Sequence, residues 1–202
     1  MTNLQKAAQI IIEGGVVIYP TETFYALGCS ALDSKACARV FECKGRDQVK
    51  PLPVLIGNPE QLEFLTSWSM TDLGSLTRKF WPGSLSVLLP AGAALPREVQ
   101  NEQGLISLRW TPHPVAQRLS LQAQCPVVAT SANFSRQDPA AKPGDLDPGL
   151  LQLADLFLDA EPWPAGGLPS TLVQFVEPGC LKVLRSGAVS GSQLREAGFK
   201  LV

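Results

Sequence analysis

Three positively charged side chains stand close together in the stretch FECKGRDQVK, residues 41–50. They are Lys44, Arg46 and Lys50, and cations this close repel one another unless an anion lies between them. Phosphate suits such a group, because a guanidinium can hold it through two hydrogen bonds. Lys44 by itself would also complement the carboxyl end of a helix, and that simpler interpretation stays open. The trio therefore predicts a phosphate-binding site.

Two further clusters of small polar side chains follow apolar segments that are typical of buried strands, residues 16–20 and 126–130. Ligands in α/β sheets bind at the carboxyl ends of strands. A capped turn would use the same residue types, so each cluster alone is a weak signal. The side chains are Thr21, Glu22 and Thr23 in the first cluster, and Ser131, Asn133 and Ser135 in the second.

Arg109 and Arg185 each stand near the end of an apolar strand, in LISLR and LKVLR. Arginine is costly to desolvate in such a place, so it usually faces a cleft or a partner. An ion pair is the alternative for each. Taken together, the four groups would line one edge of one sheet with cations and hydroxyls, which predicts a pocket for a polyanion.

Several standard sites are excluded by the residues present. His113 is the sole histidine and no two of the five cysteines form a CxxC pair, so a zinc site lacks ligands. The sequence contains no Walker-type phosphate loop and no GxGxxG motif after a strand. We expect His113 to cap or pack at a helix start, and the cysteines to be buried small hydrophobes.

The composition is that of a folded domain rather than of a dedicated nucleic-acid binder. Of the 202 residues, 45% are hydrophobic, and 17 basic against 18 acidic residues give a net charge of −1. Any basic surface must therefore be local. No membrane span or signal peptide is recognisable, which predicts a cytoplasmic protein.

Hydrophobic periodicity predicts strands and helices in alternation up to about residue 130, with strands gathered near the end. This pattern favours an α/β domain around one mixed, twisted sheet with flanking helices. The polar stretch SRQDPAAKPGDLDPG, residues 135–149, is the one long loop and a candidate cover for the pocket. Strands are predicted at 16–20, 52–57, 84–90, 105–110, 126–130, 170–176 and 181–186, and helices at about 3–13, 33–43, 71–81 and 111–123.

The motifs in their order resemble the YrdC/TsaC family of threonylcarbamoyl-AMP synthases. They are PTETFYALG, KGR followed by KPL, SLR, TSANFS, PSTLV and LRSG. The resemblance implies a single domain over residues 1–202 with a core at about 5–188, a short C-terminal helix at 190–199 and a deep, positively lined cavity. Longer relatives carry a further domain, so the chain is similar to the short bacterial type.

The resemblance also implies a reaction. The family condenses L-threonine, bicarbonate or CO₂, and ATP with its Mg²⁺ into threonylcarbamoyl-AMP and pyrophosphate. The product supplies N6-threonylcarbamoyladenosine in tRNA through downstream threonylcarbamoyl-transfer enzymes. No protein-bound metal and no membrane partner are implied, and tRNA or duplex RNA would be a weak partner.

Residue roles follow by motif from the resemblance. The cations Lys44, Arg46 and Lys50 would hold the triphosphate as the catalytic group. Threonine would meet Thr23, Arg109, Ala129 and Ser170, and ATP would also meet Ser131, Asn133 and Arg185.

Four residues depart from the usual family pattern and bear on the shape of the threonine pocket: Phe24, Ala26, Leu55 and Leu105. Two other functions stay open. One is a non-catalytic RNA-binding protein of the same fold, like YciO. The other is a carbamoyl-transfer domain like that of hydrogenase maturation proteins, although those stand in much longer chains with zinc-finger-like segments.

Overall fold

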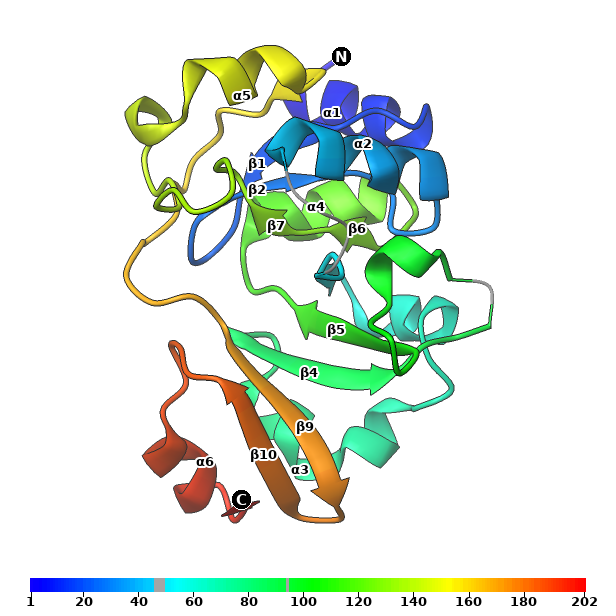
Figure 1. Cartoon of the computed structure of the whole chain (residues 1–202), viewed down its shortest axis with the longest axis vertical. Coiled ribbons are helices and arrows are strands. Elements are labelled where there is room, and N and C mark those ends of the chain that lie inside the picture. Colours follow the sequence, from blue (N-terminus) through cyan, green and yellow to red (C-terminus); the bar gives the residue numbers. More distant parts are fainter. Residues whose placement is uncertain (46–49, 94) are drawn as a thin grey trace.

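The structure, a computed structural model, describes residues 1–45, 50–93 and 95–202. Helices and strands alternate along most of the chain, and two long strands follow near its C-terminus (Figure 1). The α-helices are α1 Asn3–Ile12, α2 Ser34–Lys44, α3 Met70–Phe80, α4 Pro114–Gln122, α5 Pro148–Leu153 and α6 Gly191–Glu196, and the 3-10 helices are η1 Pro59–Phe64, η2 Arg97–Val99 and η3 Pro143–Asp145. The strands are β1 Val17–Pro20, β2 Tyr25–Gly28, β3 Val54–Ile56, β4 Leu85–Pro90, β5 Leu105–Trp110, β6 Val127–Val128, β7 Thr130–Ser131, β8 Leu156–Phe157, β9 Thr171–Glu177, β10 Cys180–Arg185 and β11 Lys200–Leu201.

The strands form two sheets, so the predicted single sheet is wrong. The small sheet has the order β7-β2-β1-β8 and the large one β11-β10-β9-β4-β5-β3-β6. Both sheets are mixed, as predicted: β1 is antiparallel to β2 and parallel to β8, and β4 is antiparallel to β5 and parallel to β9. The segment predicted as one strand at 126–130 is divided between them, because β6 pairs with β3 and β7 pairs with β2. Ala129 joins the two sheets.

The two sheets come into close contact where β2 ends. A Cβ atom on Gly28 would lie 1.8 Å from the carbonyl oxygen of Val128, so only glycine fits there. The hydroxyl of Tyr19 donates to the same carbonyl at 2.7 Å. β2 itself was not predicted, since its few residues follow Pro20 and Thr21–Phe24 without a clear alternation. This crossing brings the PTETFYALG segment against the end of β6.

Helix ends follow local signals in the sequence. The Asp33 carboxylate caps α2 by accepting from the backbone N–H groups of Lys35 and Ala36. α4 begins at Pro114 with His113 at its N-cap, slightly later than predicted. The C-terminal helix α6 spans Gly191–Glu196 and is shorter than the predicted 190–199. α1 and α4 pack together over β1 around a second, smaller core.

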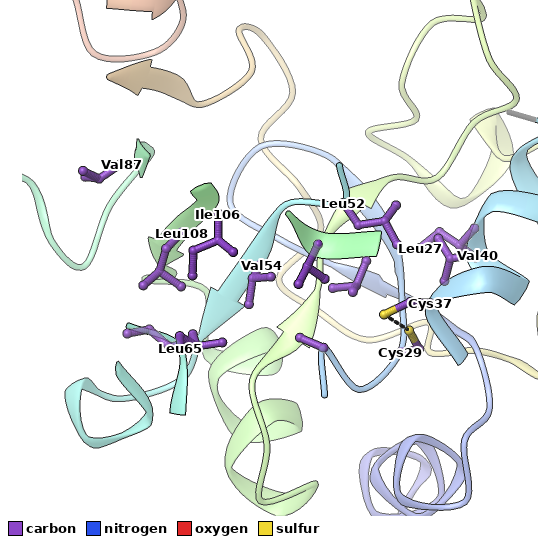
Figure 2. Packing of buried hydrophobic residues seen from close by; sticks show 14 of the residues in the cluster. Leu27, Cys29, Cys37, Val40, Leu52, Val54, Leu65, Val87, Ile106 and Leu108 are labelled. Atoms are coloured by element: carbon purple, nitrogen blue, oxygen red, sulfur yellow. Dashed lines mark hydrogen bonds between the residues drawn. The ribbon is translucent and has the colours of Figure 1, made fainter. Parts of the chain in front are cut away.

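The main core lies where α2, β2, β3 and β5 meet. Val40, Leu27, Val54 and Ile106 come from these four elements and are fully buried (Figure 2). All five cysteines are buried and free, as the sequence predicted. No helix in the described part of the chain is long and apolar enough to span a bilayer. The core therefore ties together the two sheets and the helix that carries Lys44.

Candidate active site

A cavity of about 890 Å³ lies between the two sheets. One wall comes from the small sheet and the loop before β2, and the other from strands β3, β4, β5, β9 and β10 of the large sheet. This placement explains why the polar strand ends meet although they belong to different sheets. The lining includes Thr21, Thr23, Phe24, Ala26, Lys50, Ser86, Ser107, Arg109, Ala129, Ser131, Asp138, Ser170, Leu172, Leu184 and Arg185.

The turn at Thr21–Phe24 presents two hydroxyls to the cavity. The Thr21 hydroxyl donates to the carbonyl of Phe24 at 2.7 Å and lies 3.3 Å from the hydroxyl of Thr23. Both threonines are buried. Thr21 therefore closes the turn, and Thr23 is the residue whose hydroxyl is left more open to a ligand.

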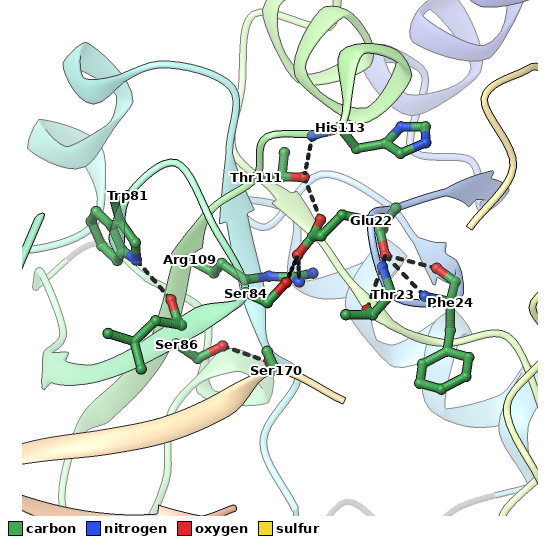
Figure 3. Close-up of polar contacts among 12 residues, drawn as sticks. Glu22, Thr23, Phe24, Trp81, Ser84, Ser86, Arg109, Thr111, His113 and Ser170 are labelled. Carbon is green, nitrogen blue, oxygen red and sulfur yellow. Dashed lines mark hydrogen bonds and ion pairs between the residues drawn. The ribbon is translucent and has the colours of Figure 1, made fainter. Parts of the chain in front are cut away.

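Arg109 reaches the cavity from β5 and forms an ion pair with Glu22 (Figure 3). Glu22 also accepts hydrogen bonds from the hydroxyl of Thr111 at 2.8 Å and from that of Ser84 at 3.3 Å. Both charged side chains are largely buried, at 8% and 14% exposure. The ion pair that the sequence left open for Arg109 is thus present, and Arg109 lines the cavity as well.

Arg185 reaches the cavity from β10 and is held by Ser170. Its guanidinium donates to the Ser170 carbonyl at 2.9 and 3.1 Å and to the Ser170 hydroxyl at 2.9 Å. That hydroxyl lies 3.0 Å from the hydroxyl of Ser86 (Figure 3). Burial lowers the pKa of Arg185, and the nearby charge of Arg109 adds to this effect.

The charges at the cavity favour an anion. Lys50, Arg109 and Arg185 line it, whereas Asp138 is the sole acidic residue among its described lining residues. Within the described residues, Arg185 has no carboxylate partner. Two guanidinium groups that share one cavity raise each other's energy until an anion binds between them.

The ammonium group of Lys44 contacts backbone carbonyl oxygens of the turn that carries Ser131. It donates to the carbonyl oxygens of Ser131 and Asn133 at 2.5 and 2.7 Å, and the Lys44 side chain is buried. Ser131 lines the cavity, whereas neither Lys44 nor Asn133 is among the lining residues described. The side-chain oxygen of Asn133 accepts from the Ser131 hydroxyl at 2.5 Å. Arg46, the third predicted cation, lies outside the described residues.

A family model covers nearly the whole of this arrangement. The Sua5/YciO/YrdC model, described as "Telomere recombination", matches residues 9–187. The chain belongs to the Sua5/YciO/YrdC family. The family that the motifs predicted is thereby confirmed.

Members of the Sua5/YciO/YrdC family differ in how much of their own length is similar to this chain. A putative threonylcarbamoyl-AMP synthase of Mycobacterium tuberculosis is 36% identical over 197 residues, which are 95% of this chain and 87% of the relative. A threonylcarbamoyl-AMP synthase of Pyrococcus abyssi is 40% identical over 132 residues, which are 65% of this chain and only 39% of the relative.

Among solved structures, P. abyssi Sua5 complexed with L-threonine has the same fold. The TM-score is 0.87 at 29% identity, and the match covers 98% of this chain and 58% of that one. The described fold is therefore that of the Sua5/YciO/YrdC family, a single α/β domain with mixed sheets.

The positions that depart from the family pattern divide into two groups. Phe24 and Ala26 line the cavity and so contribute directly to its shape. Leu55 is fully buried in the second core beneath α1 and α4, and Leu105 is half-buried at the start of β5; neither is among the lining residues described. Only the first pair bears on what the cavity admits.

Some lining residues were not singled out from the sequence. Ser86 and Leu88 alternate along β4 with Leu85, Val87 and Leu89, which face the core. Period-two alternation could have assigned them to the opposite face. Glu22 was noted, but its partner Arg109 lies 87 residues away, and no local signal reveals that pair.

The residues expected to take no part in chemistry lie away from the cavity. His113 is buried, and its Nε2 is 2.8 Å from the carbonyl oxygen of Pro162. Burial lowers its pKa, and the hydrogen bond to Pro162 opposes this shift. Across the described residues, no group of three or more histidine, cysteine, aspartate or glutamate side chains could hold a metal ion.

Proposed function

We propose that the chain is an L-threonylcarbamoyladenylate synthase that joins L-threonine, bicarbonate or CO₂, and ATP, with release of pyrophosphate. The observation that carries this proposal is the pair Arg109 and Arg185, two guanidinium groups at one cavity of which, in the described chain, Arg109 alone has a carboxylate partner, Glu22. Such a cavity suits a zwitterionic amino acid beside a polyphosphate. The names of the curated relatives support the same reaction.

Threonine would occupy the part of the cavity near Arg109. The free N–H groups of this guanidinium would bind the substrate carboxylate, and Thr23 and Ser170 would meet the hydroxyl. Ala129, at the join between the sheets, would limit the space for the side chain. The P. abyssi Sua5 structure with bound L-threonine supports this assignment by its similar fold.

ATP would occupy the part of the cavity near Lys50 and Ser131. Lys50 and Arg46 would contact the triphosphate, and Arg185 would close over the nucleotide. With these three cations around it, the cavity would be deep and basic. Lys44 and Asn133 would act on ATP indirectly, because both hold the turn that carries Ser131. Mg²⁺ would enter with ATP, and Asp138 is a carboxylate that lines the cavity and could contact it.

The chemistry needs no protein nucleophile. The amine of threonine attacks CO₂ to form an N–C bond and loses a proton, which gives a carbamate. A carbamate oxygen then attacks the α-phosphorus of ATP, and the bond to the β-phosphate oxygen breaks to release pyrophosphate. The residues would act by positioning the substrates and stabilising charge. Because a carbamate decomposes in water, the buried cavity would also protect it.

Incubation with ATP, threonine and bicarbonate tests the proposal directly. We expect threonylcarbamoyl-AMP by mass spectrometry and pyrophosphate release, both lost when any one substrate is omitted. The non-catalytic alternative, an RNA-binding protein of the same fold, predicts salt-sensitive binding of tRNA or duplex RNA without either product. The downstream transfer enzymes and a cytoplasmic location would follow from the reaction.

A further inference from the structure

Glu22 lies behind Arg109 as seen from the cavity. Arg109 is among the residues that line the cavity, whereas Glu22, Ser84 and Thr111 are not among the described lining. The carboxylate of Glu22 accepts hydrogen bonds from Arg109, Ser84 and Thr111, and both of its oxygens take part (Figure 3). The hydroxyl groups of Ser84 and Thr111 therefore hold the carboxylate independently of the guanidinium.

The orientation of a guanidinium follows from one well-placed partner, because the group is planar and its five N–H donors have a fixed geometry. Glu22 engages the Nη1 nitrogen of Arg109, and the described residues offer this side chain no second acceptor. The remaining donors are thus left to the cavity. The negative charge of Glu22 also offsets the cost of keeping Arg109 buried while the cavity is empty.

We propose that Glu22 is a positioning residue for recognition of the α-carboxylate of the amino-acid substrate, and that it acts through Arg109. The inference rests on the proposed function, in which Arg109 binds that carboxylate. Glu22 touches no substrate itself. It occupies one edge of the guanidinium, so that the N–H groups of the other edge point toward the ligand.

Two other roles make different predictions. If Glu22 competed with the substrate for Arg109, its neutralisation would strengthen threonine binding. If Glu22 only stabilised the fold, its neutralisation would affect threonine and ATP alike. Only the positioning role predicts that neutralisation weakens the binding of a ligand with an α-carboxylate and leaves the binding of a ligand without one unchanged.

The test is calorimetric binding of threonine, of ATP and of threoninol, in which the carboxylate is replaced by an alcohol. In Glu22→Gln we expect threonine to bind about 10- to 100-fold more weakly, with ATP and the already weak threoninol unchanged. Glu22→Asp keeps the charge and is the milder change, so its affinity for threonine should lie between those of the wild type and Glu22→Gln. It preserves the test if Glu22→Gln fails to fold. Asp155→Asn is the matched control, since Asp155 pairs with Arg39 away from the cavity, and should bind threonine normally.

Equal or tighter threonine binding by folded Glu22→Gln, or an equal loss for all three ligands, would overturn the inference. These results would leave the proposed function intact if the wild-type chain still forms the adenylate. A wild-type chain that binds neither threonine nor ATP would instead overturn the proposed function and the inference together.

Discussion

At the scale of single residues, the charged side chains near the cavity differ in what they contact. Lys50, Arg109 and Arg185 line it, whereas Lys44 and Glu22 contact neighbours that line it. A buried charge is tolerated only when its hydrogen-bonding capacity is met. The carbonyl oxygens around Lys44 and the guanidinium beside Glu22 meet this condition. The residue type alone does not distinguish the two kinds of role.

Lys44→Met should therefore weaken the fold around Ser131. The variant leaves the carbonyl oxygens of Ser131 and Asn133 without their ammonium donor, which we expect to lower the free energy of unfolding by about 1–3 kcal/mol. Urea denaturation measures this loss, and the KM for ATP should rise as the turn loosens. Lys35→Met, on the exposed side of the same helix, is the control and should be neutral. Full stability combined with lost ATP binding would show that the ammonium serves the phosphates instead.

At the scale of elements, the site depends on the crossing of β2 with the segment that joins β6 to β7. Ala129 and Ser131 enter the cavity because the chain leaves the large sheet after Val128 and joins the small sheet at Thr130. Gly28 permits the close approach, and the hydrogen bond from Tyr19 to Val128 holds it. The crossing therefore couples packing in the core to the position of Ser131.

Gly28→Ala should disrupt this crossing. The added methyl group would meet the backbone carbonyl of Val128, which cannot move aside as a flexible side chain can, so we expect a loss of about 3 kcal/mol in stability. Thermal and urea denaturation measure the loss. Gly144→Ala is the matched control, because a Cβ there has nothing within 4 Å, and it should change stability by less than about 0.5 kcal/mol. Equal stability of the two variants would contradict the close approach.

At the scale of the whole molecule, the cavity lies between two sheets, and the loop after β7 passes over one side of it. Asp138 and Pro139 of this loop line the cavity. The loop is anchored better than its polar composition suggested, because Ala140 is buried and its carbonyl accepts from the N–H of Tyr25 at 2.8 Å. Residues 135–138 before this anchor are exposed. The part free to respond to a ligand is thus shorter than the whole polar stretch.

Hydrogen exchange should reveal this division within the loop. We expect the amides of residues 135–138 to exchange faster than that of Tyr25 in the free protein and to gain protection when ATP and threonine are both bound, because this segment borders the cavity. The N–H of Tyr25, which donates to the anchor, should be protected in both states. Equal exchange at 135–138 with and without the two ligands would mean that the loop does not cover the site.

Local features of the protein could be predicted from its sequence, because they depend on neighbouring residues. The Asp33 cap, the buried cysteines, most strands and the family motifs are of this kind. The tertiary structure alone decided that the strands divide into two sheets, that Glu22 pairs with Arg109 and that Lys44 contacts carbonyl oxygens. Residues 87 positions apart meet in the Glu22–Arg109 pair. Periodicity and capping report on the conformation of a segment, whereas its partner is selected by packing of the whole chain.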